Sequence, residues 1–267
     1  MYLHAIDNAA RLLDERNVSG DRFDGFSTEL RPANELDAYS IQAAAADLRA
    51  QRSSNRLAGY KIGATTPVMQ QYLSIASPCA GRMLEFDLHR DGAVLSVPER
   101  TVLGVECELA VQLATDLPYK VEPYTDRELS GAIAGCMAAV EVVEDRYREW
   151  RELDASTLIA DNFFHWGAVL GATVDLDASM LASTEAFMTI DDEHVGSGHG
   201  TDVLGDPLEA LRWLASGPAT LGVGLRAGQI VLLGSLVETK WVSAGSHVRI
   251  ENSLLGAVDV HFVATPH

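Results

Sequence analysis

The sequence predicts an α+β fold, in which an N-terminal helical segment of residues 1–55 precedes a β-rich body of residues 56–267. Apolar residues recur at helical spacing in the first part, and shorter β-rich runs separated by Gly and Pro follow in the second. With 267 residues, 47% of them hydrophobic, the chain can bury a sizeable core. This composition excludes an intrinsically disordered protein.

Two amphipathic helices are predicted in the N-terminal segment. Residues 2–17 place apolar side chains at helical spacing, and Gly20 follows as a stop signal. Asn34 lies three residues before Asp37, which approximates a capping box ahead of the alanine-rich run 39–52. A second helix therefore begins after Asn34.

The body is predicted to consist mainly of strands. Residues 105–113 alternate strictly, and residues 126–139 have a helical pattern before a strand at 140–143. Asp91-Gly92 is typical of a tight turn between two strands, and a short helix at 208–215 follows a proline. Further strands are predicted at residues 187–190, 194–195, 229–236, 247–251 and 256–263.

Charge and composition exclude several classes of partner. The formal net charge of −18 argues against nucleic-acid binding, which requires clustered cationic side chains. We see no basic leader followed by an apolar stretch, and no run long enough to cross a bilayer, so we expect a soluble protein without a membrane partner. Cys79, Cys107 and Cys136 are odd in number and far apart, which favours a reducing compartment such as the cytoplasm.

Two glutamates mark the first candidate site. Successive side chains of a strand point to opposite faces, so Glu106 and Glu108 share one face of the strand at 105–113. Their Cα atoms would lie about 6.5 to 7 Å apart, which allows both carboxylates to reach one cation. Alternating glutamates are also typical of a strand face in contact with water.

Glu141 adds a third carboxylate within the apolar run 137–143. Burying an unpaired carboxylate is expensive unless it is protonated, paired or bound to a metal. Three carboxylates would make an all-oxygen site for Mg²⁺ or Mn²⁺. The alternative from these residues alone is a salt bridge from Glu141 to Arg146 or to a distant lysine.

Two further stretches complete a recognisable pattern. Residues 59–66 place Lys61 alone in an apolar, glycine-flanked run, and Asp161 and Asn162 end the apolar run 158–162. With the two glutamate elements and the stretches 203–215 and 225–235, they match one pattern in order and spacing. The chain thereby resembles the hydratase and decarboxylase branch of the fumarylacetoacetate hydrolase superfamily.

The resemblance implies a fold and a set of site residues. The fold would be a mixed β-roll, or sandwich-like body, with flanking helices that assembles into homo-oligomers. The implied metal ligands are Glu106, Glu108 and Glu141. Residues implied near the substrate are Lys61 and Asp161 as catalytic groups, with Asn162 and Ser235 as substrate-binding groups.

Some positions depart from the family pattern. The segment 78–88 should end in an acid close to the substrate, but Glu85 and Asp87 straddle the expected position; our assignment takes Glu85 as catalytic. His165 occupies a position that is commonly small in the hydratases, which indicates an altered substrate pocket or a partner of another site residue; our assignment places it with the substrate-binding groups. The glycine-rich stretch 196–200 is expected to form a flexible loop over the site.

The resemblance implies a metal-dependent hydro-lyase whose partner is a small 2-oxo acid. Its substrate would be a 2-hydroxy-2,4-dienoate of the kind released by aromatic ring cleavage, and its product a 4-hydroxy-2-oxo acid. A cation chelated by the carboxylate and keto oxygens would stabilise the enolate. Alternatives on the same fold are a 2-oxo-3-enedioate decarboxylase and an acylpyruvate-type carbon–carbon hydrolase. A non-catalytic partner subunit is the alternative from a different class.

Overall fold

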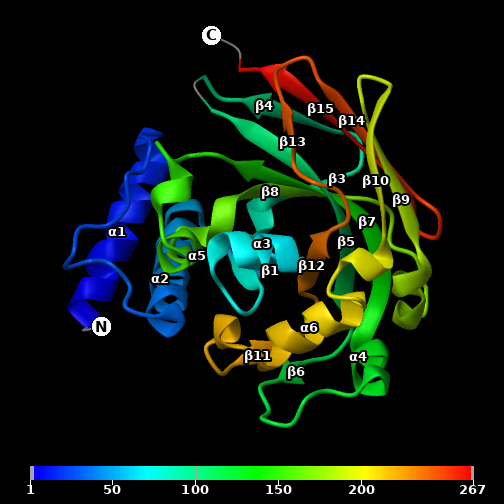
Figure 1. Ribbon diagram of the computed structural model, residues 1–267, viewed down its shortest axis with the longest axis horizontal. Coiled ribbons are helices and arrows are strands. Elements are labelled where there is room, and N and C mark those ends of the chain that lie inside the picture. The colour runs from blue at the N-terminus through cyan, green and yellow to red at the C-terminus, as the bar shows by residue number, and fades with distance from the viewer. Residues whose placement is uncertain (1–2, 100, 266–267) are drawn as a thin grey trace.

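The computed structural model describes residues 3–99 and 101–265 (Figure 1). Two N-terminal helices, α1 (Leu3–Ser19) and α2 (Glu35–Ser53), lie together on one side of the molecule. The side chain of Asn34 accepts a hydrogen bond from the Asp37 N–H at 3.0 Å, so the predicted cap of α2 is present. Both predicted helices are confirmed within the described residues. Tyr2, where the first helix was predicted to begin, lies outside them.

A large mixed sheet forms the centre of the body. Its strands follow the order β2-β1-β12-β5-β7-β8-β3, and β13 pairs with β5 beside this path. The β1–β12 and β3–β8 pairs are parallel, whereas the other pairs are antiparallel. The strands are β1 (Leu57–Gly63), β2 (Cys79–Leu84), β3 (Leu88–Arg90), β5 (Leu103–Leu113), β7 (Ile133–Glu144), β8 (His165–Leu170), β12 (Ile230–Ser235) and β13 (Lys240–Val242).

A second sheet lies on the side of the molecule away from α1 and α2, with the order β10-β9-β14-β15-β4 (Figure 1). Its strands are β4 (Ala93–Val97), β9 (Glu185–Ile190), β10 (Glu193–His199), β14 (His247–Asn252) and β15 (Gly256–Ala264). A small ribbon pairs β6 (Leu117–Pro118) with β11 (Gly224–Leu225). The predicted turn at Asp91-Gly92 therefore joins two strands, β3 and β4, that belong to different sheets.

Short helices connect and cover the sheets. The α-helices are α3 (Pro67–Leu73), α4 (Asp126–Ala132), α5 (Ala155–Ala160) and α6 (Pro207–Ser216). The 3₁₀ turns are η1 (Glu85–Asp87), η2 (Trp150–Glu152), η3 (Asn162–Phe164), η4 (Ala178–Ser183), η5 (Gly200–Asp202) and η6 (Pro218–Thr220). Across the described ranges, no helix is both long enough and apolar enough to span a bilayer.

The predicted helix at 126–139 is wrong in its second half. Helix α4 ends at Ala132, and β7 begins at Ile133 and pairs with β5 along nearly its whole length. Small residues such as Gly135 and Ala139 allow either a helix or a strand locally. The hydrogen bonds between the long strands β5 and β7, and the burial of their side chains, favour the strand. Tertiary pairing thus overrides the helical spacing.

The glycine-rich stretch 196–200 is not a flexible loop over the site. Most of it belongs to β10, which pairs with β9 in the second sheet. A Cβ atom on Gly198 would lie 2.0 Å from the Leu236 carbonyl oxygen, and one on Gly200 would lie 1.9 Å from the Leu181 carbonyl oxygen. These glycines therefore allow close backbone packing, which the sequence alone could not distinguish from flexibility.

The register of the large sheet sets which side chains share a face. Glu106 lies opposite Glu141, and Ala110 lies opposite Met137, so these side chains project from one face. A small apolar cluster on the strands of this sheet consists of Met83, Ala110, Met137, Ala139, Ala168, Ile230 and Leu232. The main core takes the alternate residues of β5, such as Val105 and Leu109. Both carboxylates of the Glu106–Glu141 pair are thus on the face away from the main core.

The helical segment is attached to the body by buried polar contacts. Gln42 of α2 donates to the Ala80 carbonyl oxygen at 2.8 Å and to the Ile159 carbonyl oxygen at 2.7 Å. The Tyr39 hydroxyl accepts from the Ala80 N–H at 3.1 Å. These contacts join α2 to β2 and α5. The division into a segment of residues 1–55 and a domain of residues 56–267 stays a prediction.

Candidate active site and metal centre

The structure brings the three predicted glutamates together. One carboxylate oxygen from each of Glu106, Glu108 and Glu141 lies within 4.8 Å of the others. Glu106 and Glu108 project from β5, and Glu141 projects from the paired strand β7. Glu108 and Glu141 are buried, whereas Glu106 is half-buried. The alternating strand pattern therefore forms a compact carboxylate cluster.

Each glutamate of this cluster has an anchored oxygen. Glu106 accepts a hydrogen bond from the Thr239 hydroxyl, and Glu108 Oε2 accepts from the Gly234 N–H at 2.7 Å. Glu141 Oε1 lies 3.1 Å from Lys61 Nζ and 3.0 Å from His165 Nδ1. Within the described part of the chain, Glu108 Oε1 and Glu141 Oε2 have no hydrogen-bond partner although both are buried. Such oxygens require another ligand.

The charges of the cluster are unbalanced. Burial, followed by the charges of Glu141 and Glu106, raises the pKa of Glu108 well above its usual range. Burial and the charge of Glu141 also raise the pKa of Glu106. Burial alone would raise the pKa of Glu141, but the charge of Lys61 and the hydrogen bond from His165 outweigh it, so that pKa is lowered. Two of the three carboxylates thus resist ionisation without a cation.

Lys61 enters the cluster from β1 as a buried side chain. Glycines make room for it on both sides. A Cβ atom on Gly81 would lie 3.1 Å from Lys61 Cε and 2.9 Å from the Asn162 carbonyl oxygen. One on Gly63 would lie 2.7 Å from the Phe163 ring, whose centroid is 5.0 Å from Lys61 Nζ. Gly81 therefore leaves room for Lys61 itself, whereas Gly63, which flanks the lysine in sequence, leaves room for the Phe163 ring beside it.

His165 is a partner of Glu141 and lies at the start of β8. The ring is buried, and its Nε2 atom lies 4.0 Å from Asp87 Oδ2. Asp87 in turn accepts from the Leu84 N–H at 2.8 Å and from Arg49 Nη2 at 2.8 Å. Of the two outcomes that the sequence left open for His165, the contacts favour a partner of another site residue.

The two acids that follow β2 lie in different surroundings. Glu85 is exposed and pairs with exposed Arg56, with 2.5 Å between Oε1 and Nε. Asp87 is the buried acid beside His165. The one-turn η1 helix places the two side chains in different environments, which a two-residue difference in sequence could not reveal. The exposure of Glu85 and its ion pair favour Asp87 over Glu85 as the acid near the site, and the catalytic assignment of Glu85 stays a prediction.

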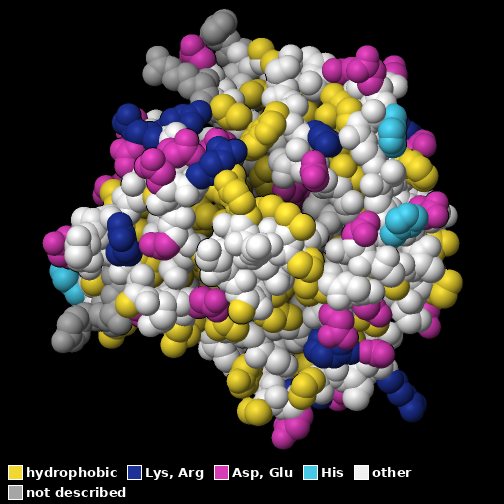
Figure 2. Space-filling view, in the orientation of Figure 1, with side chains coloured by type: hydrophobic (Ala, Val, Ile, Leu, Met, Phe, Trp, Pro, Cys, Tyr) yellow, Lys and Arg dark blue, Asp and Glu magenta, His cyan; other side chains and the backbone are white. Residues whose placement is uncertain are grey.

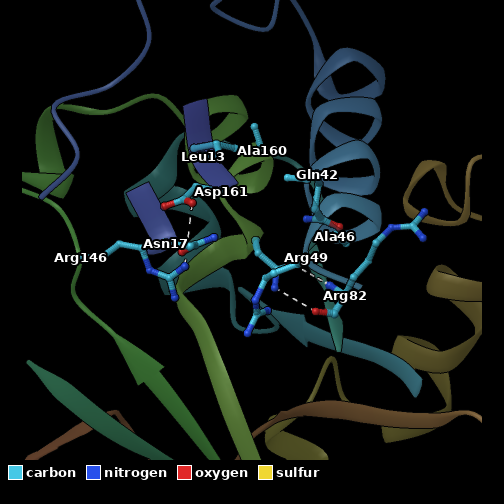
Figure 3. Close-up of a pocket in the computed structure, with 11 residues that line it drawn as sticks. Leu13, Asn17, Gln42, Ala46, Arg49, Arg82, Arg146, Ala160 and Asp161 are labelled. Atoms are coloured by element: carbon cyan, nitrogen blue, oxygen red, sulfur yellow. Dashed lines mark hydrogen bonds and ion pairs between the residues drawn. The ribbon is translucent and has the colours of Figure 1, made fainter. Parts of the chain in front are cut away.

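Asp161 and Asn162 line a separate cavity between the helices and the body (Figure 3). Asp161 Oδ1 lies 3.9 Å from Arg146 Nη1, and Figure 3 shows this carboxylate pointing toward Arg146. The amide of Asn162 accepts from the Arg82 N–H at 2.6 Å and donates to the Arg82 carbonyl oxygen at 2.9 Å. These contacts hold β2 and join Asp161 and Asn162 to arginines of the cavity, with no contact to the glutamates given among the described residues. The catalytic role of Asp161 and the substrate-binding role of Asn162 stay predictions.

Ser235 lies opposite Glu108 in the β12–β5 pair. Its hydroxyl donates to the Val237 carbonyl oxygen at 2.7 Å and lies 3.3 Å from the Cys107 carbonyl oxygen. The single hydroxyl hydrogen is therefore already used by the backbone. These contacts favour a role for Ser235 in shaping the turn after β12 over the predicted role in substrate binding.

Sequence reasoning missed two groups that contact the cluster. Thr239 carries no recognisable signal, because an isolated threonine before β13 is typical of many strand connections. The Gly234 N–H lies within the stretch 225–235, and a Cβ atom on this glycine would lie 2.7 Å from Thr65. Its φ of 137° also favours glycine. The sequence could therefore indicate that this position requires glycine, but it could not indicate that the Gly234 N–H donates to Glu108.

The donor set fits a hard divalent cation. The predicted alternative, a salt bridge from Glu141 to a distant lysine, is present as the Lys61 contact, whereas Arg146 pairs with Glu144 and Asp161. One lysine cannot neutralise three carboxylates, and two buried oxygens stay without partners. All-oxygen carboxylate sites suit Mg²⁺ and Mn²⁺. The three glutamates would hold such an ion.

The chain is similar to known proteins along most of its length. Residues 87–263 match the family described as fumarylacetoacetate (FAA) hydrolase C-terminal. The chain is 36% identical over 229 residues to a 2-keto-4-pentenoate hydratase of Paraburkholderia phymatum, covering 84% of this chain and 85% of the relative. It is 32% identical over 263 residues to a 2-keto-4-pentenoate hydratase of Burkholderia vietnamiensis, covering 97% and 98%.

A solved structure shares the fold over almost the whole chain. The 4-oxalocrotonate decarboxylase of Pseudomonas putida, complexed with magnesium and adipate, superposes with a TM-score of 0.89 at 21% identity. The match covers 98% of this chain and 99% of that structure. The predicted α+β fold of this type is confirmed.

Proposed function

The chain belongs to the fumarylacetoacetate hydrolase family, and we propose that it is a metal-dependent hydro-lyase acting on a 2-hydroxy-2,4-dienoate. The substrate is of the 2-keto-4-pentenoate type, from aromatic-compound catabolism, and the product is a 4-hydroxy-2-oxo acid. The observation that carries this proposal is the cluster of three glutamates with unpaired buried oxygens beside Lys61. Hydratases similar to the chain along almost its whole length support the choice of reaction.

The metal in this proposal is Mg²⁺ or Mn²⁺, held by Glu106, Glu108 and Glu141. When bound, the ion supplies a Lewis acid for the carboxylate and keto oxygens of the substrate, which favours the enolate. Thr239 and the Gly234 N–H fix one oxygen on each of the two β5 glutamates. His165 and Lys61 fix Glu141. These contacts orient the ligands before substrate arrives.

Lys61 is the proposed proton-transfer group. Its ammonium is buried beside Glu141, so it can move a proton in a region from which bulk water is excluded. Ketonisation transfers the enol proton to carbon 5 of the dienoate and leaves a double bond between carbons 3 and 4. Water then adds across that bond, with hydroxyl at carbon 4 and hydrogen at carbon 3. No other reactant is consumed.

Three finer features belong to the same proposal. The small-molecule partner is a 2-oxo acid or its enol, and the working form is a homo-oligomer. The compartment is the cytoplasm, which is supported by three buried free cysteines.

The test is a product assay with the metal controlled. Protein stripped with a chelator should not turn over 2-hydroxypenta-2,4-dienoate, and added Mg²⁺ or Mn²⁺ should restore a product heavier by one water in mass spectrometry. Loss of carbon dioxide from a 2-oxo-3-enedioate would instead identify a decarboxylase, and cleavage of an acylpyruvate a hydrolase. Absence of turnover on all three substrates with metal bound would favour a non-catalytic subunit and contradict the proposal.

A further inference from the structure

A row of four aromatic side chains leads from Lys61 to the surface. We name Phe163, Phe164, Trp150 and Tyr72 the aromatic row. Phe163 lies 5.0 Å from Lys61 Nζ, measured to its ring centroid, and 5.7 Å from Phe164. Phe164 lies 5.5 Å from Trp150, and Trp150 lies 5.5 Å from Tyr72 on α3. Exposure rises along the row from 5% at Phe163 to 52% at Tyr72. The row is therefore a continuous line of packed rings that begins at the buried lysine and ends at the surface.

An unusual backbone places the inner half of this row. Asn162, Phe163 and Phe164 have φ values of 62°, 46° and 64°, in the left-handed region that residues with a Cβ rarely adopt. The amide of Asn162 holds this turn to the backbone of Arg82. Gly63 lacks the side chain that would collide with the Phe163 ring. Strained backbone that persists at a site is a reason to look for a function there.

Three cations close to the row are already paired. Lys61 pairs with Glu141, and Arg146 pairs with Glu144 at 3.4 Å. Arg151 stacks on the Trp150 ring at 4.8 Å and pairs with Glu149 at 3.5 Å. A second carboxylate on the substrate would thus lose its hydration without meeting an unpaired cation among these groups.

The outer end of the row continues into exposed apolar side chains of α3. Val68 and Met69 are exposed beside Tyr72 on that helix. In the space-filling view, a recess above α3 has a largely hydrophobic rim, with acidic side chains visible inside it (Figure 2). An alkyl or aryl group placed along such a surface gains the free energy of burying apolar area.

From these observations we infer that the aromatic row binds the distal end of the substrate and selects dienoates with an uncharged alkyl or aryl tail over dienedioates. This inference rests on the proposed function, because it places the oxo-acid end at the glutamates. It assigns a specificity role to Phe163, Phe164, Trp150 and Tyr72, none of which is a metal ligand.

The test compares two tails of similar shape on the same head group. The substrates are 2-hydroxy-2,4-dienoates that carry an isobutyl or a carboxymethyl group on carbon 5. We expect kcat/KM to be at least about tenfold higher for the isobutyl substrate, since a tail with unmatched charge is rejected more strongly than one with a missing methylene. Equal values for the two tails, or a preference for the carboxymethyl tail, would overturn the inference.

Substitutions inside and outside the aromatic row test which residues select the substrate tail. Tyr72→Ala and Phe164→Ala should lower the isobutyl-to-carboxymethyl ratio of kcat/KM by about five- to fiftyfold. Phe187→Ala, a change of an exposed phenylalanine on β9 in the second sheet, should leave that ratio unchanged. Tyr72 is exposed, so its variant tests the row even where Phe164→Ala does not fold. A ratio unaffected by Tyr72→Ala in folded protein would remove the row from substrate selection.

A binding experiment separates this inference from the proposed reaction. Calorimetry with Mg²⁺-loaded protein can compare two saturated 2-oxo acids, one with an isobutyl end and one with a carboxymethyl end. Tighter binding of the isobutyl compound supports the aromatic row even where no hydration is observed, which would contradict only the proposed function. Equal affinity for the two 2-oxo acids, together with normal hydration of 2-hydroxypenta-2,4-dienoate, would contradict only the role of the aromatic row in substrate selection.

Discussion

The glutamate cluster and the cavity between the helices and the body both bury charged side chains, but they differ in how the charges are matched. In the glutamate cluster, Glu106, Glu108 and Glu141 face the single ammonium of Lys61. In the cavity between the helices and the body, Asp161 faces the Arg146 guanidinium. That cavity has a volume of about 20 Å³, which is room for roughly one water molecule.

The charges that surround a buried carboxylate distinguish a ligand site from a structural ion pair. In both regions burial raises the pKa of a carboxylate, namely Glu108 in the cluster and Asp161 in the cavity. Near Glu108 the neighbouring carboxylates raise the pKa further, whereas near Asp161 the charge of Arg146 opposes the effect of burial. An excess of like charge, not burial alone, therefore indicates a missing cation.

The largest expected effect is on turnover in the cluster. Lys61→Met should lower kcat for dienoate hydration by about 10²- to 10⁴-fold, because it removes the positioned proton-transfer group. Steady-state kinetics should show this loss while calorimetry still detects Mg²⁺ binding. A variant that loses metal and unfolds would instead assign Lys61 to a structural ion pair with Glu141.

A matched change in the cavity should affect stability more than chemistry. Arg146→Met leaves Asp161 without its cation and should lower the free energy of unfolding by about 3 to 5 kcal/mol, measured by urea denaturation. Arg151→Met is the control, since that arginine is exposed and should change stability by less than about 0.5 kcal/mol. If Arg146→Met lowers kcat as much as Lys61→Met at unchanged stability, the two regions are not functionally distinct.

A substitution of His165 tests whether a residue that contacts Glu141 also affects metal affinity. His165→Ala removes one of the two contacts to Glu141 Oε1 and should weaken Mg²⁺ or Mn²⁺ binding by about 10- to 100-fold. His89→Ala is a suitable control, because that histidine is on β3, outside the contacts described for the cluster. Unchanged metal affinity in a folded His165→Ala protein would show that this ring only fills space.

The smallest expected effect is a dependence of stability on pH. The folded-state pKa values of Glu106 and Glu108 are raised above the usual 4.5, so their protonated forms stabilise the metal-free protein below that pH. This contribution is lost as pH rises through the raised values, whereas a bound cation replaces the protons. The increase in Tm caused by Mg²⁺ should therefore grow with pH above about 4.5. An increase independent of pH would contradict the raised pKa values.

Much of the architecture was predictable because local and tertiary preferences agree. The Asn34 cap, helix α6 at Pro207 and the alternating strand β5 all have signals that burial reinforces. The second half of the predicted helix at 126–139 failed, because pairing of β7 with β5 outweighs local helical spacing. Such pairing joins residues far apart in sequence, so no local pattern reveals it.

At the site, sequence identified the residues whose chemistry was unusual for their surroundings. Glu141 and Lys61 were conspicuous as charges within apolar runs, and the structure brings them to 3.1 Å from each other. Asp161 also follows an apolar run, but its carboxylate pairs with Arg146 of another segment and does not join the glutamate cluster. Glu85 and Asp87 were indistinguishable in sequence, because a single turn of η1 decides which of them is buried.

Calorimetric titration of chelator-treated protein with Mg²⁺ and Mn²⁺ tests the central claim most directly. The comparison is Glu108→Gln, a buried carboxylate in the unbalanced cluster, against Asp161→Asn, a buried carboxylate in the balanced cavity. We predict one ion bound per chain in the wild type, at least about tenfold weaker binding in Glu108→Gln, and unchanged affinity in Asp161→Asn. Metal affinity that is unchanged in Glu108→Gln, or lowered equally in both variants, would contradict the assignment of the glutamate cluster as the metal centre.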